Sequence, residues 1–328
     1  MKAIVYTQYG PPEVAKLSEV EKPIPKDNEV LIKIHATTVN RTDCGFRSAK
    51  YFIIRLFSGL LRPKNQTLGN EFSGEIESIG KDVTSFKRND KVFGYNDTKF
   101  GGHAEYMVVP ENDAITKMPK NMSYEEAAAI TEGAHYALCN IRATKIQTGQ
   151  NFLINGATGG IGSAAVQLLK YFGAEVTAVC DAKHMELVKS LGADEVIDYT
   201  KQDFTKLNKK FDVVFDAVGK SSFGKCKPLL KKRGIYMSTE LGYMFQNPFL
   251  AIITSLFESK KVLFPIPTIS KKDVIFFKEL VEANKYKPVI DRSYSLDQIV
   301  DAYRYVETGN KIGNVVITIG QKSRLVNI

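Results

Sequence analysis

A glycine-rich turn near the middle of the chain has the residue types and the spacing to hold a phosphate group. It follows an apolar run at residues 152–154, and its members include Gly156, Thr158, Gly159, Gly160, Ile161 and Gly162. Glycines there permit a tight turn and let backbone N–H groups reach an anion at a helix N-terminus. A helical pattern continues to Phe172, and a second strand ends at Asp181, about 20 residues beyond the turn. This order predicts a dinucleotide-binding βαβ unit; the alternative is a tight βα turn that binds no ligand.

Two side chains after the second strand bear on which dinucleotide binds. Asp181 is the type of residue that accepts hydrogen bonds from the adenosine ribose hydroxyls, which favours NAD. Lys183 can pair with a 2′-phosphate, which favours NADP, although it also suits a surface lysine at the start of a helix. These two residues leave both NADP(H) and NAD(H) open.

The predicted secondary structure that positions this turn changes from β-rich to alternating strands and helices along the chain. The first 120 residues read as β-rich, with strand patterns at 30–34, 72–79 and 91–94. From a capping box at Ser123, helical segments alternate with strand patterns near 152–155, 175–180, 195–198, 213–217, 235–238 and 262–264. A helix capped at Ser295 and a strand at 313–319 then return to the first domain. We predict an α/β fold with a β-rich domain, 1–122 completed by 286–328, and an inserted domain, 123–285, built on a doubly wound parallel sheet.

Composition limits the classes of function. The chain of 328 residues is 44% apolar and 25% charged, as is ordinary for a globular protein. Its four cysteines are scattered without a CxxC motif, which predicts a reducing, cytoplasmic setting and no structural zinc. A strand pattern begins at once, so we expect no signal peptide, and no apolar run reaches the roughly 18 residues of a membrane span. The net charge of +9 comes from dispersed lysines, which predicts a solvated surface and no nucleic-acid partner.

Landmarks along nearly the whole chain resemble the medium-chain dehydrogenase/reductase superfamily, in particular its zinc-free quinone oxidoreductase branch. They are VNRTD at 39–43, GNEFSG at 69–74, the stretch 80–94, GGHAEY at 101–106, the glycine turn at 156–162, LGAD at 191–194, DAVG at 216–219 and GNVVI at 313–317. The resemblance implies a GroES-like catalytic domain, a Rossmann domain and an NAD(P)H-dependent oxidoreductase.

The chain departs from the zinc-containing members of that superfamily at their metal ligands. They carry a cysteine where this chain has Asn40 and a histidine where it has Asn70, and their four-cysteine lobe is missing between Asp90 and Gly102. The histidines sit singly, as suits packing or surface positions: His35, His103, His135 and His184. We therefore predict a metal-free enzyme. Without a Lewis acid, hydride addition to a quinone or an α,β-unsaturated carbonyl is favoured, because the product anion is delocalised. The expected substrate is a small apolar electrophile.

The resemblance supplies two candidate catalytic residues. Asn40 matches an asparagine beside the nicotinamide, where its carboxamide can bind an acceptor carbonyl or the ribose; the alternative is that it caps a loop. Tyr51 falls where quinone reductases and enoyl reductases carry a tyrosine. Its phenol can hydrogen-bond the developing oxyanion or supply a proton, unless its ring only packs with Phe46 and Phe52.

The resemblance also implies cofactor contacts beyond the glycine turn. A pyrophosphate or nicotinamide contact is expected at Thr131, and the carboxyl edge of the sheet supplies Val218, Gly219, Ser238 and Phe264. Tyr199 matches a tyrosine near the adenosine phosphate of quinone reductases, which favours NADP(H) over NAD(H).

The sequence leaves several interpretations of the apolar segments, the function and the oligomeric state open. The apolar segment 52–61 suits a lid or pocket wall, which we favour, a membrane-surface patch with Arg55 and Arg62, or part of the core. The sequence also leaves open whether a second apolar segment, 245–257, contacts the substrate or a membrane. An enoyl-thioester or 2-alkenal reductase is an alternative function, and so is a non-catalytic NADPH-binding sensor. A homodimer through an edge strand near 260–264 and a monomer are both compatible with the sequence.

Overall fold

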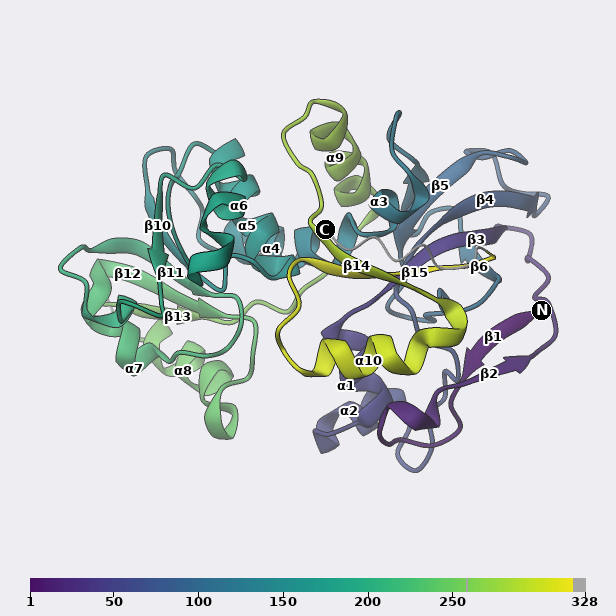
Figure 1. Cartoon of the computed structure of the whole chain (residues 1–328), viewed down its shortest axis with the longest axis horizontal. Coiled ribbons are helices and arrows are strands. Elements are labelled where there is room, and N and C mark those ends of the chain that lie inside the picture. The colour runs from purple at the N-terminus through teal and green to yellow at the C-terminus, as the bar shows by residue number, and fades with distance from the viewer. Residues whose placement is uncertain (258, 321–328) are drawn as a thin grey trace. The chain divides into compact units, whose positions relative to one another are not determined.

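The computed structural model describes residues 1–257 and 259–320, which form two compact units (Figure 1). Unit 1 comprises Met1–Glu132, Ile269–Ala283 and the chain from Lys287 onward, and unit 2 comprises Gly133–Thr268 with Asn284–Tyr286. The division falls inside helix α4 (Thr131–Ala143). The domain boundaries expected from the sequence stay a prediction.

Unit 1 is built on a seven-stranded sheet in the order β14-β15-β3-β4-β5-β7, with β6 paired to β3 off this path. Its neighbours are antiparallel except for β14 and β15, and β1 and β2 form a separate antiparallel pair. The strands are β1 (Lys2–Val5), β2 (Lys16–Glu19), β3 (Glu29–Val39), β4 (Glu71–Ile79), β5 (Lys91–Tyr95), β6 (Tyr106–Pro110), β7 (Ile115–Lys117), β14 (Ile290–Ser295) and β15 (Asn314–Thr318).

Some helices of unit 1 begin at capping residues. Ser123 accepts a hydrogen bond from the backbone of Glu126, and Ser295 forms a capping box with Gln298, so both predicted caps are confirmed. Helix α10 lies beside α1 in Figure 1, and the two are in contact. The helices are η1 (Pro12–Val14), α1 (Arg41–Ser48), α2 (Phe52–Ser58), α3 (Tyr124–Ala128), α9 (Lys271–Glu282), η6 (Leu296–Gln298) and α10 (Ile299–Glu307).

Unit 2 is a parallel sheet of six strands in the order β10-β9-β8-β11-β12-β13. The strands are β8 (Asn151–Asn155), β9 (Glu175–Cys180), β10 (Glu195–Asp198), β11 (Phe211–Asp216), β12 (Leu230–Ser238) and β13 (Lys261–Leu263). The helices are α4, α5 (Gly160–Tyr171), η2 (Ala182–His184), α6 (Met185–Ser190), η3 (Phe204–Lys206), α7 (Phe223–Cys226), η4 (Lys227–Leu229), η5 (Tyr243–Phe245) and α8 (Gln246–Ser255). Helices α5 and α6 lie on one side of the sheet and α7 and α8 on the other, so the predicted doubly wound sheet is confirmed (Figure 1).

The central strand of unit 2 explains why this sheet is covered on both faces. Phe152, Leu153 and Ile154 are successive residues of β8, and all three are fully buried. Neighbouring side chains of a strand point to opposite faces, so a continuous apolar strand needs a helix layer on each side. Burial of each such side chain contributes about 2 kcal/mol to folding.

Candidate active site

Six of the residues predicted to bind the cofactor lie at one edge of the parallel sheet of unit 2. They follow or end the six strands: Gly156 after β8, Asp181 after β9, Tyr199 after β10, Val218 two residues beyond β11, Ser238 as the last residue of β12, and Phe264 after β13. Strand β8 lies between β9 and β11, so connections from this point run in opposite directions. Open parallel sheets bind ligands at the carboxyl ends of their strands beside such a switch point.

The turn after β8 requires glycine at two positions. Gly156 has a φ of +81°, a conformation that favours glycine, and a Cβ there would lie 2.3 Å from a methyl carbon of Val218. A Cβ on Gly162 would lie 2.1 Å from the carbonyl oxygen of Gly156. Gly159 is the N-cap residue of α5 and provides no side-chain cap. The first-turn N–H groups of α5, which include those of Gly160 and Ile161, therefore keep their capacity to bind a phosphate.

Asp181 has a partner that the sequence analysis missed. It is the N-cap residue of η2, and its Oδ1 accepts hydrogen bonds from the backbone N–H of His184 at 3.1 Å and from the His184 ring. The sequence signal for this cap is an acid, Asp181, that stands three residues before His184 at the start of a helix. Lys183 is exposed in the same turn, and Tyr199 is 57% exposed.

In unit 1, Thr131 is a buried residue at the start of α4. Its backbone N–H and its hydroxyl donate to Glu71 Oε1 at 2.9 and 2.8 Å. The same oxygen accepts the backbone N–H of Glu132 at 2.6 Å, and Glu71 Oε2 accepts the hydroxyl of Thr38 at 2.6 Å. The Thr131 hydroxyl, expected at a cofactor contact, is thus engaged within unit 1.

Asn40 joins a buried polar network in unit 1. Its Oδ1 accepts the backbone N–H of Asp43 at 3.0 Å and caps α1, and its Nδ2 donates to Asn70 Oδ1 at 2.7 Å. Asn70 Nδ2 donates in turn to the Tyr95 hydroxyl at 3.0 Å and to Glu132 Oε2 at 3.1 Å. Glu132 and Tyr95 were not singled out in the sequence. Their connection depends on tertiary contacts between α4, β4 and β5, and no local pattern signals it.

The network holds three carboxyl groups: Asp43, which accepts the backbone N–H of Asn40 at 3.0 Å and whose pKa burial raises to about 7, and two glutamates in different surroundings. Burial raises the pKa of Glu71, while its hydrogen bonds from Thr38, Thr131 and Glu132 favour the charged form. Burial and the nearby charge of Glu71 raise the pKa of Glu132 to about 8, although hydrogen bonds from Thr42 and Tyr95 oppose that shift. Near neutral pH, Glu132 therefore holds a proton.

Tyr51 is far more exposed than Asn40. It is the N-cap residue of α2 and is 45% exposed, whereas Asn40 is 5% exposed. Phe46 packs on Phe100 with ring centroids 4.9 Å apart, and the alternative in which Tyr51 packs with Phe46 and Phe52 stays a prediction.

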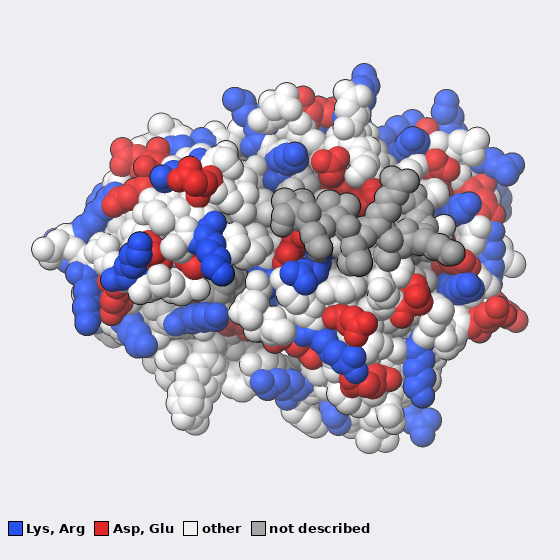
Figure 2. All heavy atoms as spheres, viewed as in Figure 1, with Lys and Arg blue, Asp and Glu red and all other residues white. Residues whose placement is uncertain are grey.

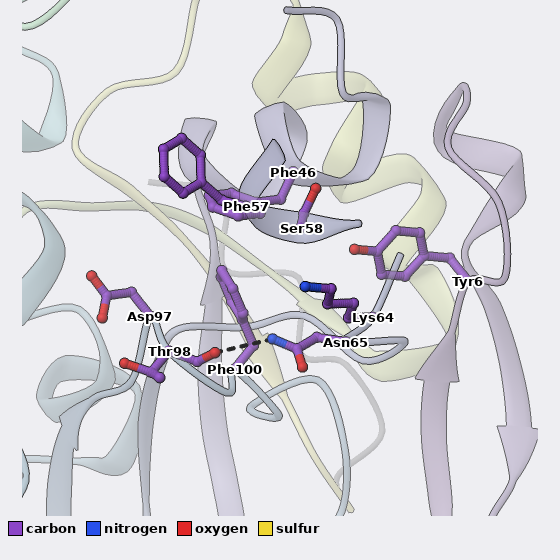
Figure 3. A pocket seen from close by; sticks show the side chains of 9 residues that line it. All are labelled: Tyr6, Phe46, Phe57, Ser58, Lys64, Asn65, Asp97, Thr98 and Phe100. Atoms are coloured by element: carbon purple, nitrogen blue, oxygen red, sulfur yellow. Dashed lines mark hydrogen bonds between the residues drawn. The ribbon is translucent and has the colours of Figure 1, made fainter. Parts of the chain in front are cut away.

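A pocket of about 270 Å³ opens beside α2 within unit 1 (Figure 3). Aromatic side chains line it together with polar side chains from two loops: Tyr6, Phe46, Phe57, Ser58, Lys64, Asn65, Asp97, Thr98 and Phe100. The Asn65 amide donates to the Thr98 carbonyl at 3.1 Å and ties the two loops together. Aromatic walls with a few polar groups suit a small apolar ligand.

Segment 52–61 is largely exposed. Helix α2 contains no buried residue, so the interpretation that this segment is part of the core is wrong. Phe57 and Ser58 line the pocket, which agrees with the pocket-wall reading. No described helix is long and apolar enough to cross a membrane. Lys and Arg are interspersed with Asp and Glu over the face seen in Figure 2.

Sequence comparisons agree with this architecture. Residues 26–120 match the alcohol dehydrogenase GroES-like domain, and residues 191–317 match the zinc-binding dehydrogenase family. A 2-methylene-furan-3-one reductase of Solanum lycopersicum is 37% identical over 97% of this chain and 79% of its own length. This chain belongs to the medium-chain dehydrogenase/reductase superfamily, in its quinone oxidoreductase-like branch.

Two further members of the superfamily cover nearly all of the chain. The chloroplastic NADPH-dependent alkenal/one oxidoreductase of Arabidopsis thaliana is 32% identical over 97% of this chain and 79% of its own length. The solved structure of the quinone oxidoreductase from Coxiella burnetii matches with a TM-score of 0.85 at 28% identity, over 97% of this chain and 99% of that one. Membership therefore implies a nicotinamide cofactor.

The residues of unit 1 do not fit the zinc that some superfamily members bind. A zinc site takes three or four thiolate, imidazole or carboxylate ligands in tetrahedral reach. The matching positions hold Asn40 and Asn70, whose amides bond to each other. Within residues 1–257 and 259–320, no group of three or more His, Cys, Asp and Glu side chains could hold a metal ion. His103, a candidate by type, is buried, and its ring bonds to the Thr38 carbonyl at 2.8 Å.

Proposed function

We propose that this chain is an NAD(P)H-dependent, zinc-independent oxidoreductase that transfers a hydride to a quinone or an α,β-unsaturated carbonyl compound. The observation that carries the proposal is the hydrogen-bonded amide pair Asn40–Asn70, which stands where zinc-containing members carry two metal ligands. Amides donate hydrogen bonds but are not Lewis acids, so they suit an acceptor whose product anion is delocalised. Relatives named for quinone, alkenal/one and methylene-furanone substrates support this class of acceptor.

The residues of the chain have separate tasks in this proposal. The backbone of the 156–162 turn binds the pyrophosphate, and the strand ends from Asp181 to Phe264 line the rest of the dinucleotide site. Asn40 and Tyr51 orient the acceptor carbonyl through hydrogen bonds, while the aromatic pocket beside α2 excludes water from a small apolar substrate. The bound cofactor supplies the hydride and is oxidised by two electrons.

We propose NADPH as the preferred cofactor and NADH as the weaker alternative. Lys183 is exposed beside the end of β9, where a 2′-phosphate would lie, and Asp181 Oδ1 is engaged by His184. Lys183 supports the phosphorylated cofactor because a lysine attracts the phosphate, and His184 engages one of the two Asp181 oxygens that suit a ribose hydroxyl. Thr131 and Tyr199 keep their predicted cofactor roles in this proposal.

The test is oxidation of NADPH and of NADH, followed by absorbance, with an ortho-quinone, a 2-alkenal and an enoyl-thioester, each with and without a chelator. We expect chelator-resistant turnover of the quinone or the alkenal and a higher kcat/KM with NADPH. Turnover of the thioester alone would favour the enoyl-thioester alternative. Tight cofactor binding without turnover of any acceptor would favour the sensor alternative and contradict the proposal.

We also propose a cytoplasmic homodimer without a nucleic-acid partner. The four cysteines Cys44, Cys139, Cys180 and Cys226 are free, which supports a reducing compartment. Strand β13 stands at the end of the strand order of unit 2, and such an edge supports pairing with a second copy. Cell fractionation and light scattering after size-exclusion chromatography test the two statements separately.

A further inference from the structure

We propose that Glu132 is the proton donor of the reaction, and that its carboxyl group protonates the acceptor oxygen on which charge develops. The inference rests on the proposed function and adds to it a residue to which the sequence analysis assigned no role. Glu132 is the second residue of α4, and its backbone N–H is held by Glu71 Oε1 at 2.6 Å. Its position is therefore fixed by the start of the helix.

The side chain of Glu132 ends the buried network that begins at Asn40. Asn40 donates to Asn70 at 2.7 Å, and Asn70 donates to Glu132 Oε2 at 3.1 Å. The Thr42 hydroxyl donates to Glu132 Oε1 at 2.7 Å, and the Tyr95 hydroxyl also bonds to this carboxyl group. These partners come from α1, β4 and β5, so the carboxyl group is oriented from several elements at once.

The two glutamates of the network differ in what they can do. Glu71 accepts hydrogen bonds from two backbone N–H groups and two hydroxyls, which favour its carboxylate and oppose the rise in pKa that burial causes. Glu132 accepts its bonds from the Thr42 and Tyr95 hydroxyls and one amide N–H, and a hydroxyl can turn to accept the proton of a neutral acid. A carboxyl group whose partners can accept its proton is suited to the role of a general acid.

The charges around Glu132 favour its neutral form. Burial and Glu71 raise the pKa of Glu132 to about 8, and Asp43 acts in the same direction. Tyr95 and Thr42 act against it through hydrogen bonds. Lys311 is the cation near this group; burial lowers the pKa of Lys311, which weakens its ability to stabilise a Glu132 carboxylate.

Glu132 is a buried residue that is not completely covered. Its residue keeps 7% of its surface exposed, whereas Glu71 and Asn70 have none. Asn40, at the other end of the network, keeps 5%. In this proposal the acceptor oxygen binds at these two ends of the network, Glu132 and Asn40.

The step balances without a further reactant. The proposed reaction delivers a hydride, with its two electrons, to the conjugated carbon, and the π electrons of the acceptor move onto its carbonyl oxygen. The O–H bond of Glu132 breaks as a new O–H bond forms on that oxygen, which leaves an enol; it tautomerises to the saturated ketone or, when the acceptor is a quinone, to the hydroquinone. Glu132 becomes a carboxylate and regains a proton from water, which can reach it through the partly exposed Thr42 hydroxyl.

The first test is the pH dependence of kcat with the best quinone or alkenal acceptor. The wild-type rate should fall above about pH 8, because the donor must hold its proton. Glu132→Gln keeps the shape and the hydrogen-bonding capacity but cannot donate a proton, so kcat should fall by about 100-fold and the alkaline decline should disappear. Glu132→Asp should restore part of the rate together with the decline.

Three further variants separate this role from a structural one. Thr42→Val removes a bond that lowers the pKa of Glu132, so its alkaline decline should move to higher pH. Glu186→Gln, at a side chain that is 86% exposed, should change nothing. Tyr51→Phe should keep the alkaline decline. If Tyr51→Phe removes the decline, or if Glu132→Gln keeps it at full rate, Glu132 is not the donor.

An infrared titration without substrate distinguishes failure of this inference from failure of the proposed function. The wild-type protein with NADPH bound should show a carboxylic acid C=O component that disappears near pH 8 and is missing in Glu132→Gln, whereas Asp43, whose pKa burial raises to about 7, should lose its own component at lower pH in both proteins. NADPH affinity, measured by calorimetry, should stay within about twofold in that variant, because the substitution keeps the shape of the side chain. Presence of the Glu132 component in a protein that reduces no acceptor would contradict the proposed function. Turnover of an acceptor by a protein that lacks the Glu132 component would contradict the role of Glu132 alone.

Discussion

Two neighbouring glycines of the turn after β8 allow folding and cofactor binding to be separated by experiment. A Cβ on Gly162 would stand 2.1 Å from the Gly156 carbonyl oxygen and 2.9 Å from the Ala157 Cα. A Cβ on Gly159 would meet only the Gly156 oxygen, at 3.7 Å, and the φ of −71° at Gly159 suits alanine. Gly162→Ala therefore strains the protein itself, whereas Gly159→Ala adds a methyl group at the N-cap of α5, where the pyrophosphate is proposed to bind.

The size of each effect follows from these contacts. Ordinary contact needs about 3.4 Å, so the Gly162→Ala methyl must move the turn or helix by more than 1 Å. Overpacking of that kind costs about 2 kcal/mol and should lower the Tm of the cofactor-free protein by roughly 4–8 °C. Gly159→Ala should cost at most about 1 kcal/mol of stability. Its methyl group blocks the approach of the phosphate, so NADPH affinity should fall at least about tenfold, which corresponds to about 1.4 kcal/mol.

Differential scanning calorimetry without cofactor and isothermal titration with NADPH measure the two effects on the same samples. An unchanged Tm for Gly162→Ala would show that α5 does not approach the turn as closely as the structure has it. NADPH binding by Gly159→Ala with wild-type affinity would refute the assignment of the pyrophosphate to this helix start.

Lys183→Ala should raise the Kd for NADPH about tenfold and leave that for NADH unchanged, because only the phosphorylated cofactor pairs with this lysine; equal effects on both cofactors would contradict the NADPH preference. Tyr51→Phe should lower kcat about tenfold with NADPH affinity retained, through loss of a hydrogen bond to the developing oxyanion, and an unchanged kcat would remove Tyr51 from the mechanism. Glu132 has a raised pKa of about 8 in the folded chain and about 4.3 when unfolded, so it stabilises the fold fully below pH 4.3 and this contribution is lost as pH rises towards 8. The Tm of the wild type should accordingly fall relative to Glu132→Gln between pH 5 and pH 8, and a constant difference across that range would mean that Glu132 is ionised throughout.

Much of unit 2 could be predicted because its signals are local. Each buried parallel strand is a short apolar run, and the residue after it stands at the carboxyl edge wherever the strand lies in the sheet. Asp181 and Tyr199 could therefore be placed from the sequence. His184, the partner of Asp181, was not predicted, because an acid at this position can bind either a ribose hydroxyl or the N–H group of a helix start.

Unit 1 was harder to predict for physical reasons. Strand β3 continues to Val39, well beyond the predicted end at residue 34, and its pairing with β4 shifts register between Ile34 and Ala36. Such an irregularity breaks the alternation on which strand prediction depends. The contacts that join Glu71 and Glu132 to Asn70 and Thr42 link segments distant in the sequence. Residue types suggest such a network only once the fold has brought them together.

The exposed helix α2 has a consequence for how this protein will be degraded. None of its residues is buried, and its tie to the rest of unit 1 includes the Tyr9 hydroxyl, which bonds to Ser58 and Gly59 at its C-terminal end. Because α2 buries little apolar surface, its local unfolding costs little free energy. Proteases will therefore reach this segment before the sheets unfold. Chymotrypsin should cut first at Phe52 or Phe57, which are 64% and 75% exposed. The nicked protein should lose the wall of its aromatic pocket and still retain the dinucleotide site of unit 2.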